Sequence, residues 1–141
     1  GLVWSADQLF SAGKTFTTST SIEGTLDDPL FQSERYGPTF EYTIPVPQPG
    51  KYMVGLLFSE IYFKEPGQRL ISVDINIDRV LNNYDILSEV PPFSAVTKAF
   101  SITVTGTSVV IKFSSSNQNA KVSGITVTLL DPLVPTSSPI P

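Results

Sequence analysis

The sequence predicts an all-β fold, an antiparallel β-sandwich, on the basis of two observations. Apolar residues alternate with polar ones in seven or eight short segments, and clusters of Gly, Pro, Asn and Ser separate these segments. No segment holds a helical period, and residues 6–11 could form one short turn at most. Many strands joined by short connections are typical of two packed antiparallel sheets.

The first expected strands frame a proline-rich turn. Residues 40–46 alternate cleanly, and Pro45 belongs at an edge or a strand end because it has no N–H to donate. Residues 51–63 are apolar on both faces at their centre, which predicts a strand covered on both sides. Gly55 within it marks a bulge or a close backbone approach.

The remaining strands are expected at 69–77, 79–87, 96–104, 109–113 and 120–130. The first of these places Ile71, Val73, Ile75 and Ile77 on one buried face. Because the β-branched Ile77 resists a positive φ, a type I′ turn at 76–77 is not expected, and the turn should move to 78–79 or lengthen. The phase of the last strand changes, which predicts a bulge near Ser123 and Gly124.

Composition limits the possible functions. The chain has 141 residues, 40% of them hydrophobic, and a formal net charge of −4, so nucleic-acid binding is not expected. It contains no His and no Cys, which removes the usual general base, the Ser-His-Asp triad and the common zinc ligands. No apolar run is long enough to span a bilayer. We therefore expect no cofactor, no metal and no direct insertion into a membrane.

The end of the chain differs from the rest. Residues 131–141 are rich in Pro and Ser, as linkers are, so we expect a domain of residues 1–130 followed by a linker or tail. The chain starts at Gly1 without a signal peptide, which favours an excised domain or a processed product. We expect covalently linked neighbouring domains.

Three segments carry the chemical content. Residues 23–37 are expected to form a long loop without regular structure, and they include Tyr36. Tyr62 and Phe63 end a hydrophobic run, and both rings can point off the sandwich edge if the strand ends at Ile61. Residues 114–119 are expected to form a polar loop of hydroxyl and amide groups.

This mixture is what a carbohydrate site needs. Sugar C–H faces stack on aromatic rings, and sugar hydroxyls need amide and carboxylate partners around them. The alternative is that Tyr62 and Phe63 plug the open end of the core, since buried aromatic residues are common.

These stretches resemble the malectin family of carbohydrate-binding modules. The motifs are, in order, DDPLFQSERYG (27–37), FEYTIPV (40–46), GKYMVGLLFSEIYF (50–63), LNNYDIL (81–87) and NAKVSGI (119–125). The resemblance runs from about Trp4 to Leu130. It implies a jelly-roll-like, galactose-binding-domain-like β-sandwich with a non-catalytic glycan site on loops at one edge. It also implies an extracellular location or one in the lumen of the secretory pathway.

The resemblance further assigns site residues. The aromatic residues of the family site match Tyr36, Tyr62 and Phe63, and a further upstream Tyr is missing, with Phe16 the nearest aromatic residue. The family Asp falls at Gln118, which can bind hydroxyls but loses the charge-assisted hydrogen bond. We therefore expect the three matched rings to stack on the sugar, and the side chains of Gln118, Asn117 and Asn119 to form hydrogen bonds with it.

Three functions remain open. The leading hypothesis is a module that binds neutral, glucose-containing oligosaccharides, because the family's namesake resembles a reader of glucose-terminated glycans. The alternative is a protein–protein interaction or adhesion domain of a larger multidomain protein, which gains support if Tyr62 and Phe63 are buried. The third is a small glycosidase that uses two carboxylates across the cleft. A structural role is favoured for Glu34, Arg35 and Glu60, with the Arg between the two acids.

Three polar or aromatic features are interpreted as structural. Asp74, Asn76 and Asp78 lie on one strand face and lack the spacing of a calcium loop, so a solvated face is expected. Asp27 and Asp28 precede a proline, which favours a turn or a helix cap. The single Trp, Trp4, is expected to seal one end of the sandwich.

Overall fold

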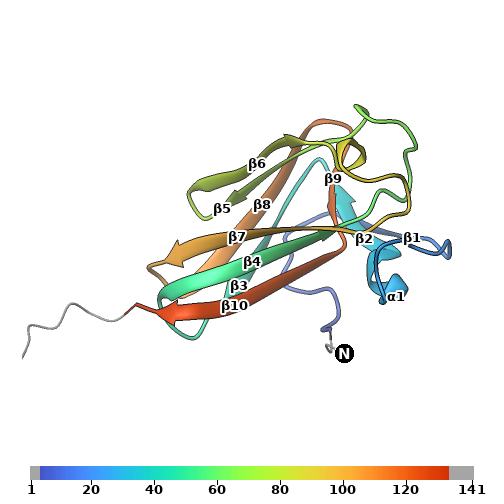
Figure 1. The fold of residues 1–141 in the computed structure, drawn as a ribbon. Coiled ribbons are helices and arrows are strands. Elements are labelled where there is room, and N and C mark those ends of the chain that lie inside the picture. The colour runs from blue at the N-terminus through green and yellow to red at the C-terminus, as the bar shows by residue number, and fades with distance from the viewer. Residues whose placement is uncertain (1–3, 134–141) are drawn as a thin grey trace, which may run out of the picture.

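The computed structural model describes residues 4–133 as an antiparallel β-sandwich with a smaller third sheet at one end (Figure 1). One sheet of the sandwich has three strands in the order β10-β4-β7, with β4 (Gly50–Phe58), β7 (Val96–Val104) and β10 (Gly124–Pro132). The four-stranded sheet has the order β3-β8-β5-β6, with β3 (Thr39–Pro45), β5 (Leu70–Ile75), β6 (Asp78–Tyr84) and β8 (Ser108–Asn117). The predicted sandwich is confirmed.

The third sheet lies at the end of the sandwich away from the C-terminal end of β10 (Figure 1). Its order is β1-β2-β9, with β1 (Lys14–Thr17), β2 (Ser33–Gly37) and β9 (Ala120–Val122). The helix α1 (Asp28–Phe31) leads into β2, and the 3-10 helix η1 (Ile86–Ser88) follows β6. Within residues 4–133, no helix is long and apolar enough to cross a membrane.

Period-two patterning builds the core between the two large sheets. The inward residues of β8 and β5 are completely buried: Val109, Ile111, Phe113, Ile71, Val73 and Ile75. Ile77 does not continue this face; it is 96% exposed, so its predicted burial is wrong. The cause is the hairpin, since β5 ends at Ile75 and Ile77 lies in the turn.

The hairpin turn stays at Asn76 and Ile77, so the expectation that it would move or lengthen is wrong. Asn76 takes the positive φ, 53°, which Asn tolerates better than most residues, and Ile77 remains outside that region. The N–H of Asn76 donates to the carbonyl oxygen of Val110 at 2.8 Å, and the Asn76 side-chain oxygen accepts from the Val110 N–H at 2.9 Å. The neighbouring strand β8 therefore holds the turn in place.

A second hydrophobic cluster lies on the other face of β4. Leu56 and Phe58 point into the sandwich core, whereas Leu57 packs in this second cluster. Its other buried members are Ile22, Phe31 and Ile61, and Trp4, predicted to seal one end of the sandwich, packs against this cluster on the outer face of β4. The strand β4 is therefore covered on both sides, as its continuous apolar run predicted.

Two segments expected to be irregular contain regular structure. The loop predicted at 23–37 holds α1 and β2, because Phe31 is buried in the second cluster and the carboxylate of Asp28 accepts from the Ile22 N–H at 3.1 Å. The polar loop predicted at 114–119 is mostly strand, because β8 continues to Asn117.

The chain changes sheets after β9. Residue Ser123 separates β9 from β10, and its N–H donates to the carbonyl oxygen of Leu57 at 2.8 Å. The bulge predicted near Ser123 and Gly124 is therefore wrong: the chain changes sheet there, and the register shift of β10 against β4 lies between Leu129 and Asp131. The predicted linker or tail, 131–141, begins inside β10, and its residues from 134 onward lie outside the described residues.

Gly55 of β4 pairs with Thr126 of β10. A Cβ added at Gly55 would lie well inside van der Waals distance of the Thr126 side-chain oxygen, and the next neighbouring atom is 3.7 Å away. We expect Gly55→Ala to destabilise the fold by about 1–3 kcal/mol through overpacking, measured by chemical denaturation. Thr126→Ala removes the oxygen that the new methyl group would meet, so Gly55→Ala should cost much less in a Thr126→Ala background than in the wild type. An equal cost in both backgrounds would contradict this.

Candidate functional site

The alternation along β2 sorts its side chains between the two faces of the small sheet. Glu34 and Tyr36 share one face, and Arg35 points to the other. Across the sheet, Phe16 pairs with Glu34, and Lys14 pairs with Tyr36. Two aromatic rings therefore project from the same face of the small sheet.

Tyr62 and Phe63 complete this aromatic surface. The strand β4 ends at Phe58 and Ile61 is buried, so the next two rings lie beyond the core, with Tyr62 64% exposed and Phe63 partly buried. The Tyr62 and Phe63 rings meet edge to face with centroids 5.0 Å apart, and Tyr62 meets Phe16 in the same way at 5.9 Å. The alternative in which Tyr62 and Phe63 plug the core is therefore wrong.

Glu60 fixes the main chain beneath these rings. Its Oε2 atom accepts from the N–H groups of Tyr62 at 3.2 Å and Phe63 at 3.3 Å. The guanidinium of Arg69 donates to both Glu60 oxygens, at 2.6 and 3.3 Å, and the Glu60 side chain is 1% exposed. A charged side chain buried this deeply is retained because its hydrogen bonds are satisfied.

Lys121 joins the two acids. Its side chain is completely buried, its ammonium group forms an ion pair with Glu34, and it lies 3.6 Å from Glu60. Lys121 is also the cross-strand partner of Tyr36. We call Glu34, Glu60, Arg69 and Lys121 the ion network; when all four are ionised, its two positive and two negative charges balance.

The predicted grouping of Glu34, Arg35 and Glu60 is wrong in one member. Arg35 lies on the opposite face of the small sheet, where its Nε donates to Asp7 at 2.8 Å. Its guanidinium carbon lies 3.4 Å from the centroid of the Phe10 ring. Neighbouring residues of a strand point in opposite directions, so Glu34 and Arg35 cannot face the same partners.

Burial and charge move the pKa values of the network in different directions. Burial raises the pKa of Glu34, although Lys121 opposes this, and burial lowers the pKa of Lys121. Burial also acts to raise the pKa of Glu60, but the nearby Lys121 and Arg69 outweigh it and hold that pKa below its ordinary value. Glu60 therefore stays ionised.

The lowered pKa of Glu60 makes stability depend on pH. Ionised Glu60 stabilises the fold above its ordinary pKa of 4.5, and this contribution is lost as pH falls through the lower folded-state value. We expect the difference in unfolding free energy between the wild type and Glu60→Gln to be largest near neutral pH and to shrink below about pH 4.5. Denaturant titrations across that range measure it. A difference that does not change with pH would contradict the assignment.

The turn between β8 and β9 approaches the loop that carries the rings. The side-chain nitrogen of Asn117 donates to the main-chain oxygen of Gln68 at 2.9 Å and more weakly to that of Gly67 at 3.4 Å. Gln118 is exposed with a φ of 63°, and its carbonyl oxygen accepts from the hydroxyl of Ser115. The amide donor of Asn117 is thus engaged within the protein, and the Gln118 side chain lies at the surface.

A pocket of about 380 Å³ opens beside Tyr36. It is lined by Gly13, Lys14, Tyr36, Gly37, Pro38 and Asn119. Gly13 is required there, since its φ is 101° and an added Cβ would lie 2.9 Å from the Tyr36 carbonyl oxygen. Sequence analysis missed Lys14, although its position two residues before Phe16 places both on one face of a strand. Arg69 links the pocket to the exposed rings, because it donates to the carbonyl oxygen of Asn119 and lies over the ring of Phe63. We call the surface of Phe16, Tyr36, Tyr62 and Phe63 together with this pocket the aromatic cleft.

A larger cavity of about 860 Å³ lies on the opposite side of the small sheet. It runs between the edge strands β3 and β10 beneath residues 4–9. Its aromatic residues are held by the protein, because Trp4 packs against the second cluster and the Tyr42 hydroxyl donates to Asp7 at 2.6 Å. Among the rings of residues 4–133, the most exposed is Tyr62 of the aromatic cleft, at 64% against 40% for Phe10.

Residues 1–134 match the family model described as Malectin domain. Malectin from Homo sapiens is 37% identical over 65 residues, which are 45% of this chain and 22% of that protein. Malectin-B from Xenopus laevis is 35% identical over 65 residues, 45% of this chain and 24% of that protein. The matched region therefore spans about a quarter or less of the length of these relatives.

Two solved structures have similar folds. One chain of Bacteroides uniformis beta-glucuronidase is 28% identical with a TM-score of 0.74, and the match covers 86% of this chain and 14% of that one. The ANX2 ectodomain from Arabidopsis thaliana is 15% identical with a TM-score of 0.74, and the match covers 87% of this chain and 41% of that one. The second likeness concerns the fold alone.

Proposed function

The chain belongs to the malectin domain family, and from this we propose that it is a non-catalytic module that binds oligosaccharides in the aromatic cleft. The single observation that carries the proposal is the position of Tyr62. It is 64% exposed, yet it contacts the rings of both Phe16 and Phe63. A large exposed ring that the fold holds in place is suited to stacking on the apolar face of a sugar.

The proposed mechanism combines stacking with hydrogen bonding. The rings of Tyr36, Tyr62 and Phe63 stack on sugar faces, with Phe16 supporting Tyr62. Aromatic side chains supply contact area at low entropic cost, and Glu60 fixes the main chain of Tyr62 and Phe63 before the ligand arrives. We expect Kd values of roughly micromolar to millimolar, because an open surface buries little area.

Polar groups at the rim would orient the sugar. The exposed side chain of Gln118 and the partly buried Asn119 offer donors and acceptors to hydroxyl groups. The amide nitrogen of Asn117 is engaged, so we assign its amide oxygen as the group that accepts from a hydroxyl. The charges beneath the cleft balance, which favours neutral oligosaccharides over charged ones. Glucose-containing oligosaccharides are the first candidates because the chain belongs to the malectin domain family.

The same contacts argue for a binding role without catalysis. A glycosidase needs two carboxyl groups that face the substrate. Glu34 and Glu60 are buried and are held by Lys121, and Glu60 also by Arg69. We therefore assign the two acids to the support of the cleft.

The relatives also favour a module within a larger protein. The fold forms 14% of a beta-glucuronidase chain and 41% of a plant ectodomain. We propose that residues 131–141 link this domain to neighbouring domains, and that the protein acts outside the cell or in the lumen of the secretory pathway.

A glycan array tests the proposal directly. The folded 141-residue chain is applied to glucose-, galactose- and mannose-containing oligosaccharides, and the hits are measured by calorimetry. We expect binding to glucose-containing oligosaccharides. If the folded protein binds none of the glycans, the proposed function is overturned.

A further inference from the structure

We propose that Arg69 is a positioning residue that sets the separation between the two walls of the aromatic cleft. One wall is the segment that carries Tyr62 and Phe63, and the other is the turn that carries Asn119 beside Tyr36. The inference rests on the proposed function, because the spacing of the walls matters to a ligand only if the cleft binds one.

Arg69 contacts both walls at once. On the first wall it donates to Glu60, which in turn accepts from the Tyr62 and Phe63 N–H groups. On the second wall another of its N–H groups donates to the carbonyl oxygen of Asn119 at 2.7 Å. Its guanidinium carbon also lies 4.9 Å from the centroid of the Phe63 ring. One buried side chain therefore links a stacking ring, the anchor of that ring and the opposite rim.

The chemistry of Arg explains why a single residue can do this. The guanidinium is planar and presents five donors in a fixed arrangement, so its contacts with Glu60 and with Asn119 lock each other in position. A Lys ammonium is a point charge on a flexible stem, and it cannot reproduce the fork on Glu60 while it also reaches Asn119. At 6% exposure, little water is available to replace a lost contact.

The second wall continues from Asn119 into β9, where Lys121 pairs with Tyr36 across the sheet. Lys121 lies 3.6 Å from Glu60, so the ion network joins the walls a second time. A shift of Arg69 would move Asn119 and Phe63 relative to each other without removing either ligand-binding group. This separates positioning from direct contact with the sugar.

Arg35 provides a matched control. It is 8% exposed, against 6% for Arg69, and it has the same three kinds of partner: a carboxylate (Asp7), a main-chain oxygen (Ala12) and an aromatic ring (Phe10). Arg35 points to the opposite face of the small sheet, and none of these three partners lines the pocket of the aromatic cleft. Arg35→Lys should therefore reproduce the loss of stability that Arg69→Lys causes, without changing the cleft.

The experiment compares Arg69→Lys, Arg35→Lys and the wild type. Calorimetry measures the affinity of each protein for the oligosaccharide that the wild type binds most tightly on the array, and chemical denaturation measures stability. We expect Arg69→Lys to weaken binding about tenfold and Arg35→Lys to change it less than about twofold, with similar losses of stability. Equal affinities for all three proteins would overturn the inference, and so would parallel losses of affinity in both variants.

A second measurement does not need a ligand. We expect the amide hydrogens of Tyr62 and Phe63 to exchange with solvent at least about tenfold faster in Arg69→Lys than in Arg35→Lys, because their acceptor Glu60 loses its bidentate partner. Unchanged exchange would overturn the inference even if the wild type binds no glycan. If Arg69→Lys does not fold, the double variant Glu60→Gln with Arg69→Gln takes its place, because it removes Arg69 and keeps the net charge of the network. Wild-type affinity in that double variant would count against the inference.

Discussion

Replacement of Lys121 by Ala is expected to destabilise the fold by about 3–5 kcal/mol, the cost of breaking a buried ion pair from one side. The variant leaves the carboxylates of Glu34 and Glu60 facing each other across a buried site that then holds Arg69 as its remaining cation. Chemical denaturation at neutral pH measures the loss in unfolding free energy.

The control for this prediction is Lys112→Ala. Lys112 lies on β8 with its side chain exposed, so its replacement should change stability by no more than about 0.5 kcal/mol. A loss below about 1 kcal/mol for Lys121→Ala would mean that water reaches the network and replaces the ammonium group. In that case the network would not be the rigid support that the cleft requires.

Tyr62→Ala is expected to weaken oligosaccharide binding by about 30-fold or more, as loss of a central aromatic contact does. The ring is 64% exposed, so the loss of its two edge-to-face contacts should lower stability by no more than about 1–2 kcal/mol. Tyr62→Phe keeps the ring and should keep most of the affinity. Calorimetry with the same oligosaccharide measures all three proteins.

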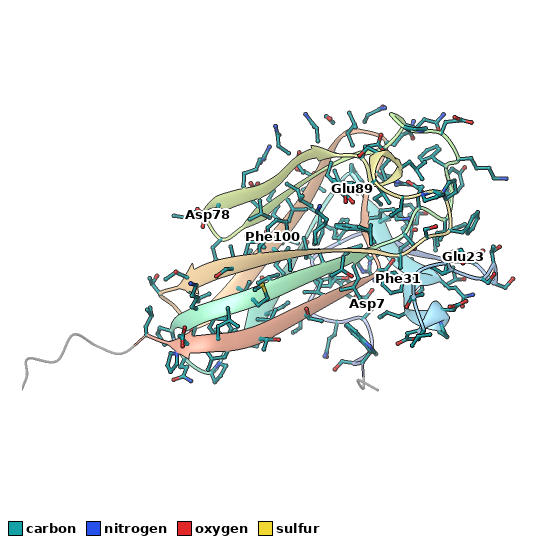
Figure 2. The ribbon with its side chains drawn as sticks, viewed as in Figure 1. Asp7, Glu23, Phe31, Asp78, Glu89 and Phe100 are labelled. Atoms are coloured by element: carbon teal, nitrogen blue, oxygen red, sulfur yellow. The ribbon has the colours of Figure 1, made fainter. Side chains whose placement is uncertain are left out.

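Ile77→Ala is the matched surface control. Ile77 is 96% exposed in the hairpin beside Asp78, and Figure 2 shows Asp78 at the end of the sandwich away from Phe31 and Glu23. It should not change affinity. If Tyr62→Ala binds as tightly as Ile77→Ala does, the exposed ring is not part of the site.

The sandwich could be predicted from local pattern alone. In β5 and in residues 109–113 of β8 every second residue is apolar, and those residues are completely buried in the structure. The continuous apolar run of β4 also predicted its cover on both faces, since Leu57 packs in one cluster and Leu56 in the other. The predicted position of Ile77 was wrong because an alternating pattern does not show where a hairpin turns.

The ion network could not be predicted in the same way. Its cation Lys121 lies between two buried residues of β9, and its partner Glu34 is far away in the sequence. Residues 23–37 carry no alternating apolar pattern, so the sequence does not reveal that Glu34 and Arg35 point in opposite directions along β2. The pairing of β2 with β9 is a long-range contact, and no local signal encodes it.

Nuclear magnetic resonance titration of the isotope-labelled chain with a glucose-containing oligosaccharide locates the binding site residue by residue. We expect shifts to concentrate on Tyr36, Tyr62, Phe63 and Asn119, while the indole N–H of Trp4, the single Trp of the chain, stays unchanged beside the larger cavity. Shifts centred on Trp4 and Tyr42, or no shifts at ligand concentrations of several millimolar, would contradict it.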